Sequence, residues 1–367
     1  MSISRAIAWL TSSVVLAVFA APAMAAPPDL RLKVDVVELV AGKEVPGNPD
    51  LSLQHQGIEY LFATPTNMTT FEKDPARFEV ADGGACGSMG PLAGIGYAGR
   101  YAVHEGRIYF FASDGCRANF LKDPARCIEN AQPAPTGTPE QLQQGLAILD
   151  RVVQWAGGEK AIKEVSTYRE HYAKTVKSGG KDWAVTKVVG ARFPGHFAQK
   201  DAWNESWWST ISTPLGGCTT SASTYDMMAE SRRLAFERWM ARTPIVILKA
   251  RFEPGFIAIA DGEGTVNGLG VVFVKVGFDG ATSRLTIDKA SGRLMQLAFH
   301  GRDDTPFVGD SIRTYTTYDT INGVTLPTQW TTNFDGKEDE KLTVKLDGFE
   351  INPVLEPEVF NIAPDHP

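Results

Sequence analysis

Cysteine is the residue type with the clearest chemistry in this chain, and the sequence contains four: Cys86, Cys116, Cys127 and Cys218. A thiolate is a nucleophile and a ligand for soft metal ions. In an oxidising compartment, an even number of cysteines also favours disulfides. Four cysteines allow three complete pairings, and the sequence does not select one of them. The compartment in which the protein works therefore decides which chemistry is open to these residues.

Familiar catalytic motifs are absent from the sequence. It has no His-Glu-x-x-His, no Gly-x-Ser-x-Gly and no phosphate-binding loop of the Walker type. The six histidines are scattered, and no pair of carboxylates is flanked by apolar residues, so no general acid or base stands out. We therefore expect a binding protein rather than an enzyme. A hydrolase with an unrecognised site is the alternative.

The first 25 residues have the features of a secretory signal peptide. Arg5 is their only charge, residues 6–21 form an apolar run, and Ala23-Met24-Ala25 gives the small-x-small pattern before a cleavage site. The run is short for a membrane span, and no later stretch reaches about 18 apolar residues. We expect cleavage after Ala25 and a soluble periplasmic protein, in which disulfides can form.

Composition excludes some partners. The 367 residues are 43% hydrophobic and 22% charged, which is typical of folded globular chains and allows two or three domains. The formal net charge is -7, and no cluster of Lys and Arg interrupts this acidic balance. A nucleic-acid partner is therefore not expected, since phosphates require a positive field.

An internal repeat organises residues 30–131, the region that holds three of the cysteines. Residues 55–78 and 104–127 align without a gap at a constant offset of 49, and 11 of 24 positions are identical. In each copy a Gly turn leads into a short aromatic strand, and a Ser, Thr or Asp then starts a helix that ends before Asp-Pro. This pattern predicts one small domain of two strand–helix units, whose aromatic residues share a core: Tyr60, Phe62, Phe71, Tyr109, Phe111 and Phe120.

A Pro-rich linker at 132–140 separates this domain from a second one at 141–364. Helical spacing of apolar residues predicts a helix over 140–157, and a shorter helix follows at 160–165. Strand signals then dominate, interrupted by one helix at 225–241. Asn322-Gly323 and Asp335-Gly336 are typical of hairpin turns. The expected strands cover 185–191, 252–260, 270–278, 284–288, 293–300, 311–320, 324–334 and 341–350.

The second copy of the repeat resembles the YHS domain family. The resemblance is carried by three segments: Cys86-Gly87-Ser88-Met89, the run from Gly106 to Cys116 (GRIYFFASDGC), and Phe120 followed by Asp123-Pro124. Gly83-Gly84-Ala85-Cys86 is similar to the link between copies in periplasmic two-copy members. The resemblance implies a metal-handling domain, often one that handles copper.

The chain departs from the YHS pattern at several ligand positions. Ala112 stands where metal-binding members have their middle Cys, Ser88 is inserted between Gly and Met, and Cys127 replaces an aromatic residue. The resemblance therefore implies at most a pair of thiolates, Cys86 and Cys116. Such a pair suits Cu(I) better than structural zinc, which requires four ligands. A disulfide, Cys86–Cys116 or Cys116–Cys127, is the alternative. Further metal ligands could come from Met89, Cys127 or His104.

The second domain resembles the lipoprotein-carrier (LolA-like) superfamily. The matching residues are Trp155-Ala156-Gly157-Gly158 near the start, Asn322-Gly323-Val324 with Leu326-Pro327, and the closing segment from Asn352 to Pro364. This resemblance implies a curved antiparallel half-barrel, closed by helices over an apolar cavity that holds acyl chains. The whole fold is then α+β. Candidate cavity-lining residues are Trp203, Trp207, Trp208, Met227, Met228 and Trp239, and the alternative is that these side chains are core.

We therefore expect a non-enzymatic periplasmic binding protein that handles a metal, with copper as the first candidate, through its N-terminal domain. The second hypothesis is a carrier of an apolar ligand or lipoprotein in the C-terminal half-barrel, with the small domain as a docking module. Loss of Cu(I) binding in Cys86→Ser would favour the first hypothesis. Lipid that co-purifies with the protein would favour the second.

Overall fold

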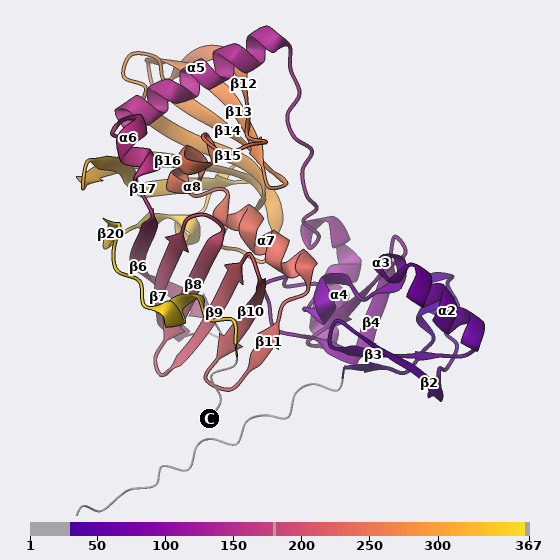
Figure 1. The fold of residues 1–367 in the computed structure, drawn as a ribbon. Helices are drawn as coiled ribbons and strands as arrows, with labels where there is room; N and C mark the ends of the chain where they lie inside the picture. Colours follow the sequence, from indigo (N-terminus) through magenta and orange to yellow (C-terminus); the bar gives the residue numbers. More distant parts are fainter. Residues whose placement is uncertain (1–29, 179–180, 364–367) are drawn as a thin grey trace, which may run out of the picture.

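The computed structural model describes residues 30–178 and 181–363 (Figure 1). The predicted signal peptide and Pro364, the end of the predicted second domain, lie outside these residues. The fold is α+β, as the sequence predicts. Two small sheets with short helices come first, and two large antiparallel sheets with helices follow. Among the described residues, no helix combines the length and apolar character needed to cross a bilayer.

Both copies of the repeat form a β-hairpin followed by a helix, and each boundary in the second copy falls 49 residues after its counterpart. The first copy consists of β2 (Asn48–His55), β3 (Ile58–Phe62) and α2 (Pro65–Lys73). The second consists of β4 (Tyr97–His104), β5 (Arg107–Phe111) and α4 (Asp114–Lys122). The other elements of this domain are β1 (Arg31–Leu32), α1 (Val36–Val40), α3 (Pro75–Phe78), η1 (Ala81–Gly84) and η2 (Pro124–Arg126).

Local chemistry explains why the copies match. Gln56-Gly57 and Glu105-Gly106 both adopt left-handed φ values, 48° and 78° in the first turn and 49° and 74° in the second. Two consecutive left-handed residues are what a tight hairpin turn requires. The side chains of Thr64 and Ser113 then cap the helices, accepting hydrogen bonds from backbone N–H groups in the first turn.

The aromatic residues of each copy surround the phenylalanine of its helix. All six predicted rings are buried, but they belong to two hydrophobic clusters, one for each copy. The prediction of one shared core is therefore wrong. The reason is the alternation of β5, in which Ile108 and Phe110 pack into the first cluster while their neighbours pack into the second. The ring centroids lie at matching distances: Tyr60–Phe71 4.7 Å, Tyr109–Phe120 4.8 Å, Phe62–Phe71 5.5 Å and Phe111–Phe120 5.2 Å.

The larger part of the chain begins with α5 (Pro139–Trp155) and α6 (Gly158–Lys163) and contains two antiparallel sheets. The seven-stranded sheet has the order β11-β10-β9-β8-β7-β6-β20. Its strands are β6 (Thr167–Ser178), β7 (Lys181–Arg192), β8 (His196–Trp203), β9 (Ser206–Thr213), β10 (Gly216–Ser221), β11 (Tyr225–Met227) and β20 (Gly348–Ile351).

The eight-stranded sheet is a meander, as its hairpin signals predict. Both Asn322-Gly323 and Asp335-Gly336 have left-handed φ values and form turns between strands. The strands are β12 (Ile257–Val266), β13 (Leu269–Phe278), β14 (Ala281–Asp288), β15 (Leu294–Arg302), β16 (Val308–Ile321), β17 (Val324–Phe334), β18 (Lys337–Glu338) and β19 (Val344–Lys345).

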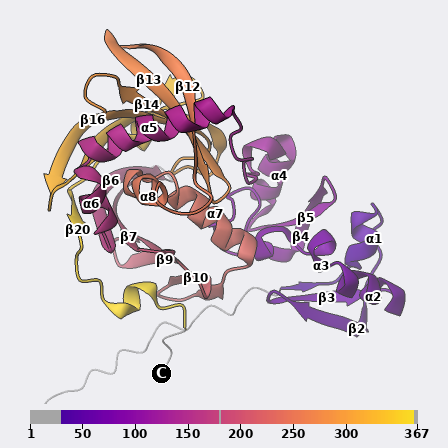
Figure 2. The same cartoon turned by 45° about the horizontal axis from the view of Figure 1, so that its top comes forward.

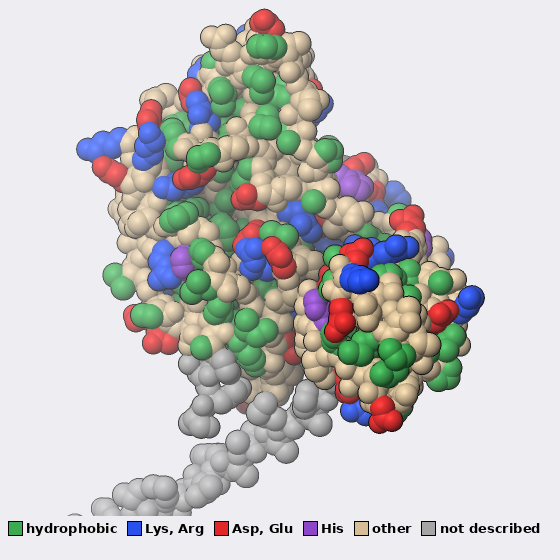
Figure 3. Space-filling model, turned by 45° about the vertical axis from the view of Figure 1, so that its right-hand side comes forward, with side chains coloured by type: hydrophobic (Ala, Val, Ile, Leu, Met, Phe, Trp, Pro, Cys, Tyr) green, Lys and Arg blue, Asp and Glu red, His purple; other side chains and the backbone are tan. Residues whose placement is uncertain are grey.

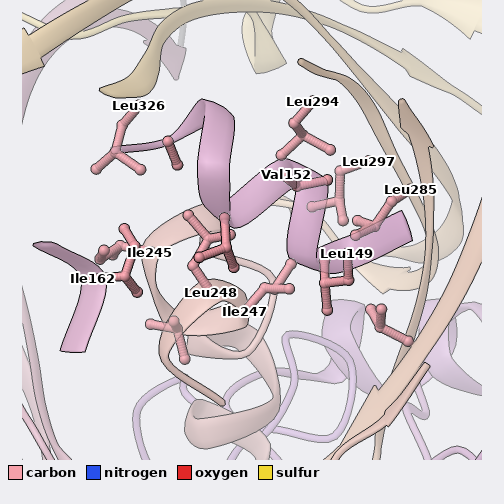
Figure 4. Close-up of a cluster of buried hydrophobic side chains, with 14 of the residues drawn as sticks. Leu149, Val152, Ile162, Ile245, Ile247, Leu248, Leu285, Leu294, Leu297 and Leu326 are labelled. Carbon is pink, nitrogen blue, oxygen red and sulfur yellow. The ribbon is translucent and has the colours of Figure 1, made fainter. Parts of the chain in front are cut away.

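The two large sheets curve around helices that fill the space between them. Figure 2 shows α7 (Glu230–Met240) and α8 (Pro244–Ala250) inside the ring of strands, and α5 packs on β12 and β13. Figure 4 shows the resulting core, in which Leu149 of α5, Leu248 of α8 and Leu297 of β15 converge. The concave side of the half-barrel is therefore largely filled by protein side chains.

Two predicted elements of the large domain are wrong. Residues 225–241 do not form one helix, because Tyr225–Met227 pairs with β10 as β11 and α7 begins only at Glu230. Residues 341–350 do not form one strand. The chain makes η3 (Glu340–Leu342) and β19, then crosses to the other sheet as β20 beside β6. An alternating pattern is satisfied equally well in either sheet, so the sequence alone did not reveal the crossing.

Buried arginines of the large domain hold the small domain in place. Arg232 is fully buried, and its guanidinium donates to the backbone oxygens of Pro91 (2.8 Å) and Ala93 (3.1 Å). Arg242 pairs with Glu129.

In Figure 3, positive and negative side chains are mixed over the visible face of both parts, without a broad basic area.

Candidate functional site

Three of the four cysteines gather in the second copy of the repeat. Cys86 and Cys127 are buried in one hydrophobic cluster, and Cys116 packs against it. The Cys86 sulfur accepts a hydrogen bond from the Ala112 N–H at 3.4 Å. All four cysteines are free thiols in this structure. Tertiary structure thus brings together the two cysteines of the YHS resemblance and adds Cys127, while Cys218 lies in the large domain.

This cluster favours neutral thiols over thiolates. Burial raises the pKa of Cys86 and of Cys127 above the ordinary thiol value. Within the described residues, no group of three or more His, Cys, Asp and Glu side chains is placed to hold a metal ion. Met89, a predicted further ligand, is half exposed. The donor set therefore fits at most a two-thiolate site, and copper binding stays a prediction.

The six aromatic and methionine residues predicted to line a cavity occupy different places. Trp207 lies on the outer face of the seven-stranded sheet, whereas Trp239 of α7 lies inside, with its ring 6.1 Å from that of Phe236. Trp208 is next to Gly94 of the small domain. Trp207 and Trp208 are consecutive residues of β9, so their side chains point to opposite faces of the sheet. The alternation of side chains along a strand predicts this difference from the sequence. Of the remaining three, Trp203 ends β8, Met227 is exposed and Met228 is buried.

A groove of about 660 Å³ lies on the outer face of the seven-stranded sheet, the face turned away from α7 and α8. Such a volume is in the range of small-molecule sites. The floor carries small side chains on β7 and β8, and residues 355–363 cover part of it. The groove is lined by Arg169, Val188, Gly190, Ala198, Lys200, Trp207, Ser209, Ile211, Cys218, Thr220, Ser221, Ala222, Tyr225, Leu355, Glu358, Val359, Asn361 and Ala363.

Strand register arranges the floor of this groove in two rows. In the first row, Gly190 is paired with Ala198, Ala198 with Ile211, and Ile211 with Cys218. In the second row, Val188 is paired with Lys200, Lys200 with Ser209, and Ser209 with Thr220. The first row is apolar throughout, and the second carries a cation and two hydroxyl groups. The two rows are about 7 Å apart, the distance of two residues along a strand.

The C-terminal segment 352–363, which we call the strap, roofs the apolar row. Asn352 anchors its start, since its side-chain oxygen accepts from the backbone N–H groups of Ser166 (2.7 Å) and Thr167 (3.3 Å). Within the strap, η4 (Pro357–Phe360) lies over β8 and β9. Phe360 is buried against Ala198, Ile211 and Cys218. Figure 2 shows the strap on the outside of the ring of strands.

A network of ions lies between the inner face of the same sheet, with Lys187 and Glu170, and the eight-stranded sheet, which contributes Asp303, Asp304 and Arg313. Lys187 is 2% exposed, and its ammonium lies 2.5 Å from Asp304 and 3.4 Å from Asp201. Arg313 pairs with Asp303 at 2.5 Å. Burial raises the pKa of Glu170, whose carboxylate accepts a hydrogen bond from Tyr168. The adjoining cavity has about 30 Å³, enough for roughly two water molecules and not for a substrate.

Comparison with known proteins gives remote structural similarity. No protein-family model matches the sequence, and no curated protein matches it. A DUF1329 family protein from Desulfovibrio piger aligns over 60% of this chain and 97% of its own, at 10% identity and a TM-score of 0.40. A LolA superfamily protein from Nitrosomonas europaea aligns over 57% of this chain and 96% of its own, at 11% identity and a TM-score of 0.39. The YHS resemblance therefore stays a prediction.

Proposed function

We propose that this protein is a periplasmic, non-enzymatic carrier that binds an apolar ligand in the groove between the seven-stranded sheet and the strap. The observation that supports this proposal most is the groove of about 660 Å³ between sheet and strap, whose floor includes an apolar row of Gly190, Ala198, Ile211 and Cys218 that Phe360 of the strap covers. An apolar chain placed there would be removed from water, which is the main driving force for such binding. Between the two large sheets, the cavity beside the described ion network has only about 30 Å³.

A matched pair of glycine variants tests the site. At Gly190 an added Cβ would meet its nearest atoms at 3.8 and 4.0 Å, so Gly190→Leu places its side chain in the groove without a backbone clash. Gly270, on an exposed stretch of β13, has no atom within 4 Å of an added Cβ, so Gly270→Leu is the control.

The measurement is native mass spectrometry of protein from the periplasm, followed by titration with hexadecanol that displaces the neutral fluorescent probe N-phenyl-1-naphthylamine. We expect wild type and Gly270→Leu to bind the probe and the alcohol, and Gly190→Leu to lose at least about tenfold in affinity, as the apolar volume is filled. Equal binding by all three proteins would place the site elsewhere, and no binding by wild type would refute the carrier function.

The cluster of thiols supports a second, independent proposal, that Cys86 and Cys116 hold Cu(I). Cys116 packs against the cluster that buries Cys86, and two soft ligands suffice for this ion. Titration of reduced protein with Cu(I), in competition with a chromophoric chelator, should show one site that Cys86→Ser removes and Cys218→Ser leaves unchanged. Uptake that persists in Cys86→Ser would refute the assignment.

A further inference from the structure

Lys200 is the cation of the groove that has no acidic partner among the ion pairs of the described residues. The other cation in the lining, Arg169, is bound by both carboxylate oxygens of Glu350, at 2.7 and 2.8 Å. That contact lowers the pKa of Glu350, so both groups are charged and neutralise each other. The Lys200 ammonium lies 4.8 Å from the centre of the Trp207 ring. It is exposed to the groove and available to a ligand.

The neighbours of Lys200 are suited to an anionic head group. Ser209 lies next to it on β9, and Thr220 follows on β10. Both hydroxyl groups reach backbone oxygens of their own hairpins at 3.2 Å, and a hydroxyl can rotate to donate to a ligand instead. The strap adds one exposed carboxylate to the lining, Glu358, which favours a head group with one negative charge over one with two.

We propose that the groove binds a single-chain anionic amphiphile of the fatty-acid class, a class of ligand that rests on the proposed carrier function. The hydrocarbon chain lies along the apolar row from Gly190 to Cys218, across four strands and therefore over about 14 Å. There it replaces the side chain of Phe360, which buries Ala198, Ile211 and Cys218 in this structure. The carboxylate lies in the polar row at Lys200. The division of the floor into two rows is what orients the ligand, because each end meets the surface that matches it.

The test compares two ligands of the same chain length, palmitate and hexadecanol, at pH 8 and low ionic strength. Lys200→Met removes the charge and keeps most of the aliphatic stem, and Lys122→Met, at an exposed position of the small domain, is the control. We expect wild type to bind palmitate more tightly than hexadecanol. Lys200→Met should weaken palmitate binding by about fivefold, as expected for one exposed ion pair, and leave hexadecanol unchanged.

The outcomes separate this inference from the carrier function. Equal affinity of wild type for palmitate and hexadecanol overturns the head-group assignment and leaves the carrier function standing. The assignment is also wrong if Lys200→Met weakens both ligands equally, since the lysine would then act through packing. Tighter binding of hexadecyl phosphate than of palmitate would overturn the preference for a single charge. If wild type binds none of these compounds, the carrier function itself fails.

Discussion

The two faces of the seven-stranded sheet show how one strand serves opposite purposes. Lys187 and Val188 are neighbours on β7, yet Lys187 is 2% exposed inside a paired ion network, and Val188 is 37% exposed at the edge of the groove. The inner face is covered by the helices between the sheets, which fill it. Of the described residues, those of the strap cover the outer face, and they leave a groove of about 660 Å³. We therefore expect stability to depend on the inner face, and the ligand site that we propose lies on the outer one.

The largest expected effect is on the inner face. Lys187→Met removes the buried cation shared by Asp304 and Asp201 and leaves Asp304 only its contact with Lys174, so we expect a loss near the lower end of the roughly 3–5 kcal/mol typical of a broken buried ion pair. Urea unfolding followed by tryptophan fluorescence measures this loss in free energy of unfolding. A loss below about 1 kcal/mol would mean that the network contributes little and that the contrast between the faces is smaller than the burial indicates.

The same pair predicts a pH dependence. Burial would raise the pKa of Asp304, but Lys187 and Lys174 lower it well below its usual range, and Asp304 in turn raises the pKa of Lys187. The contribution of the pair is therefore present between about pH 4 and pH 10, the unfolded-state pKa values of the two groups. It is lost as the pH falls through the pKa of folded Asp304. We expect the stability gap between wild type and Lys187→Met to narrow below pH 4, and a gap that widens in acid would contradict the assignment.

Two glycines, one on each face of the sheet, allow the packing of the two faces to be compared. The expected change in stability is of intermediate size. On the inner face, a Cβ at Gly217 would lie 2.5 Å from Met228 and 2.8 Å from the Ile211 oxygen, so Gly217→Leu should cost about 1–3 kcal/mol through overpacking. On the outer face, Gly190→Leu should leave stability unchanged or raise it by up to about 1 kcal/mol, because glycine is unfavourable within a strand. Thermal unfolding measures the change in stability of both variants. Equal losses of stability would show that the outer face is packed as tightly as the inner face.

The smallest effect on global stability is expected at the strap. Phe360→Ala removes its buried anchor, but release of the strap is a local opening, so the free energy of global unfolding should fall by only about 1 kcal/mol. Hydrogen exchange followed by mass spectrometry should show faster exchange in segment 352–363, with β14 and β15 unchanged. Protection of the strap equal to that in wild type would show that Phe360 does not hold it.

Much of the small domain could be predicted from the sequence, because its determinants are local. The offset of 49 recurs in the boundaries of both strands and of the longer helix of the repeat, since turn glycines, helix caps and Asp-Pro steps act within a few residues. Local signals in the sequence also predicted helix α5 and the turn at Asn322-Gly323. The packing of Cys127 and Cys86 in one cluster could not be predicted from local signals, because it depends on how the helices pack on the strands.

The sequence by itself determined the α+β class, the internal repeat and the meander, for which residue spacing and turn chemistry suffice. Tertiary structure alone decided that β20 joins β6, that Trp207 and Trp239 lie in different places, and that the hollow is outside the half-barrel. Alternation assigns residues to two faces of a strand but does not say which face the helices will cover. That choice comes from packing between segments far apart in the chain, where α7 and α8 fill one side and residues 352–363 cover part of the other.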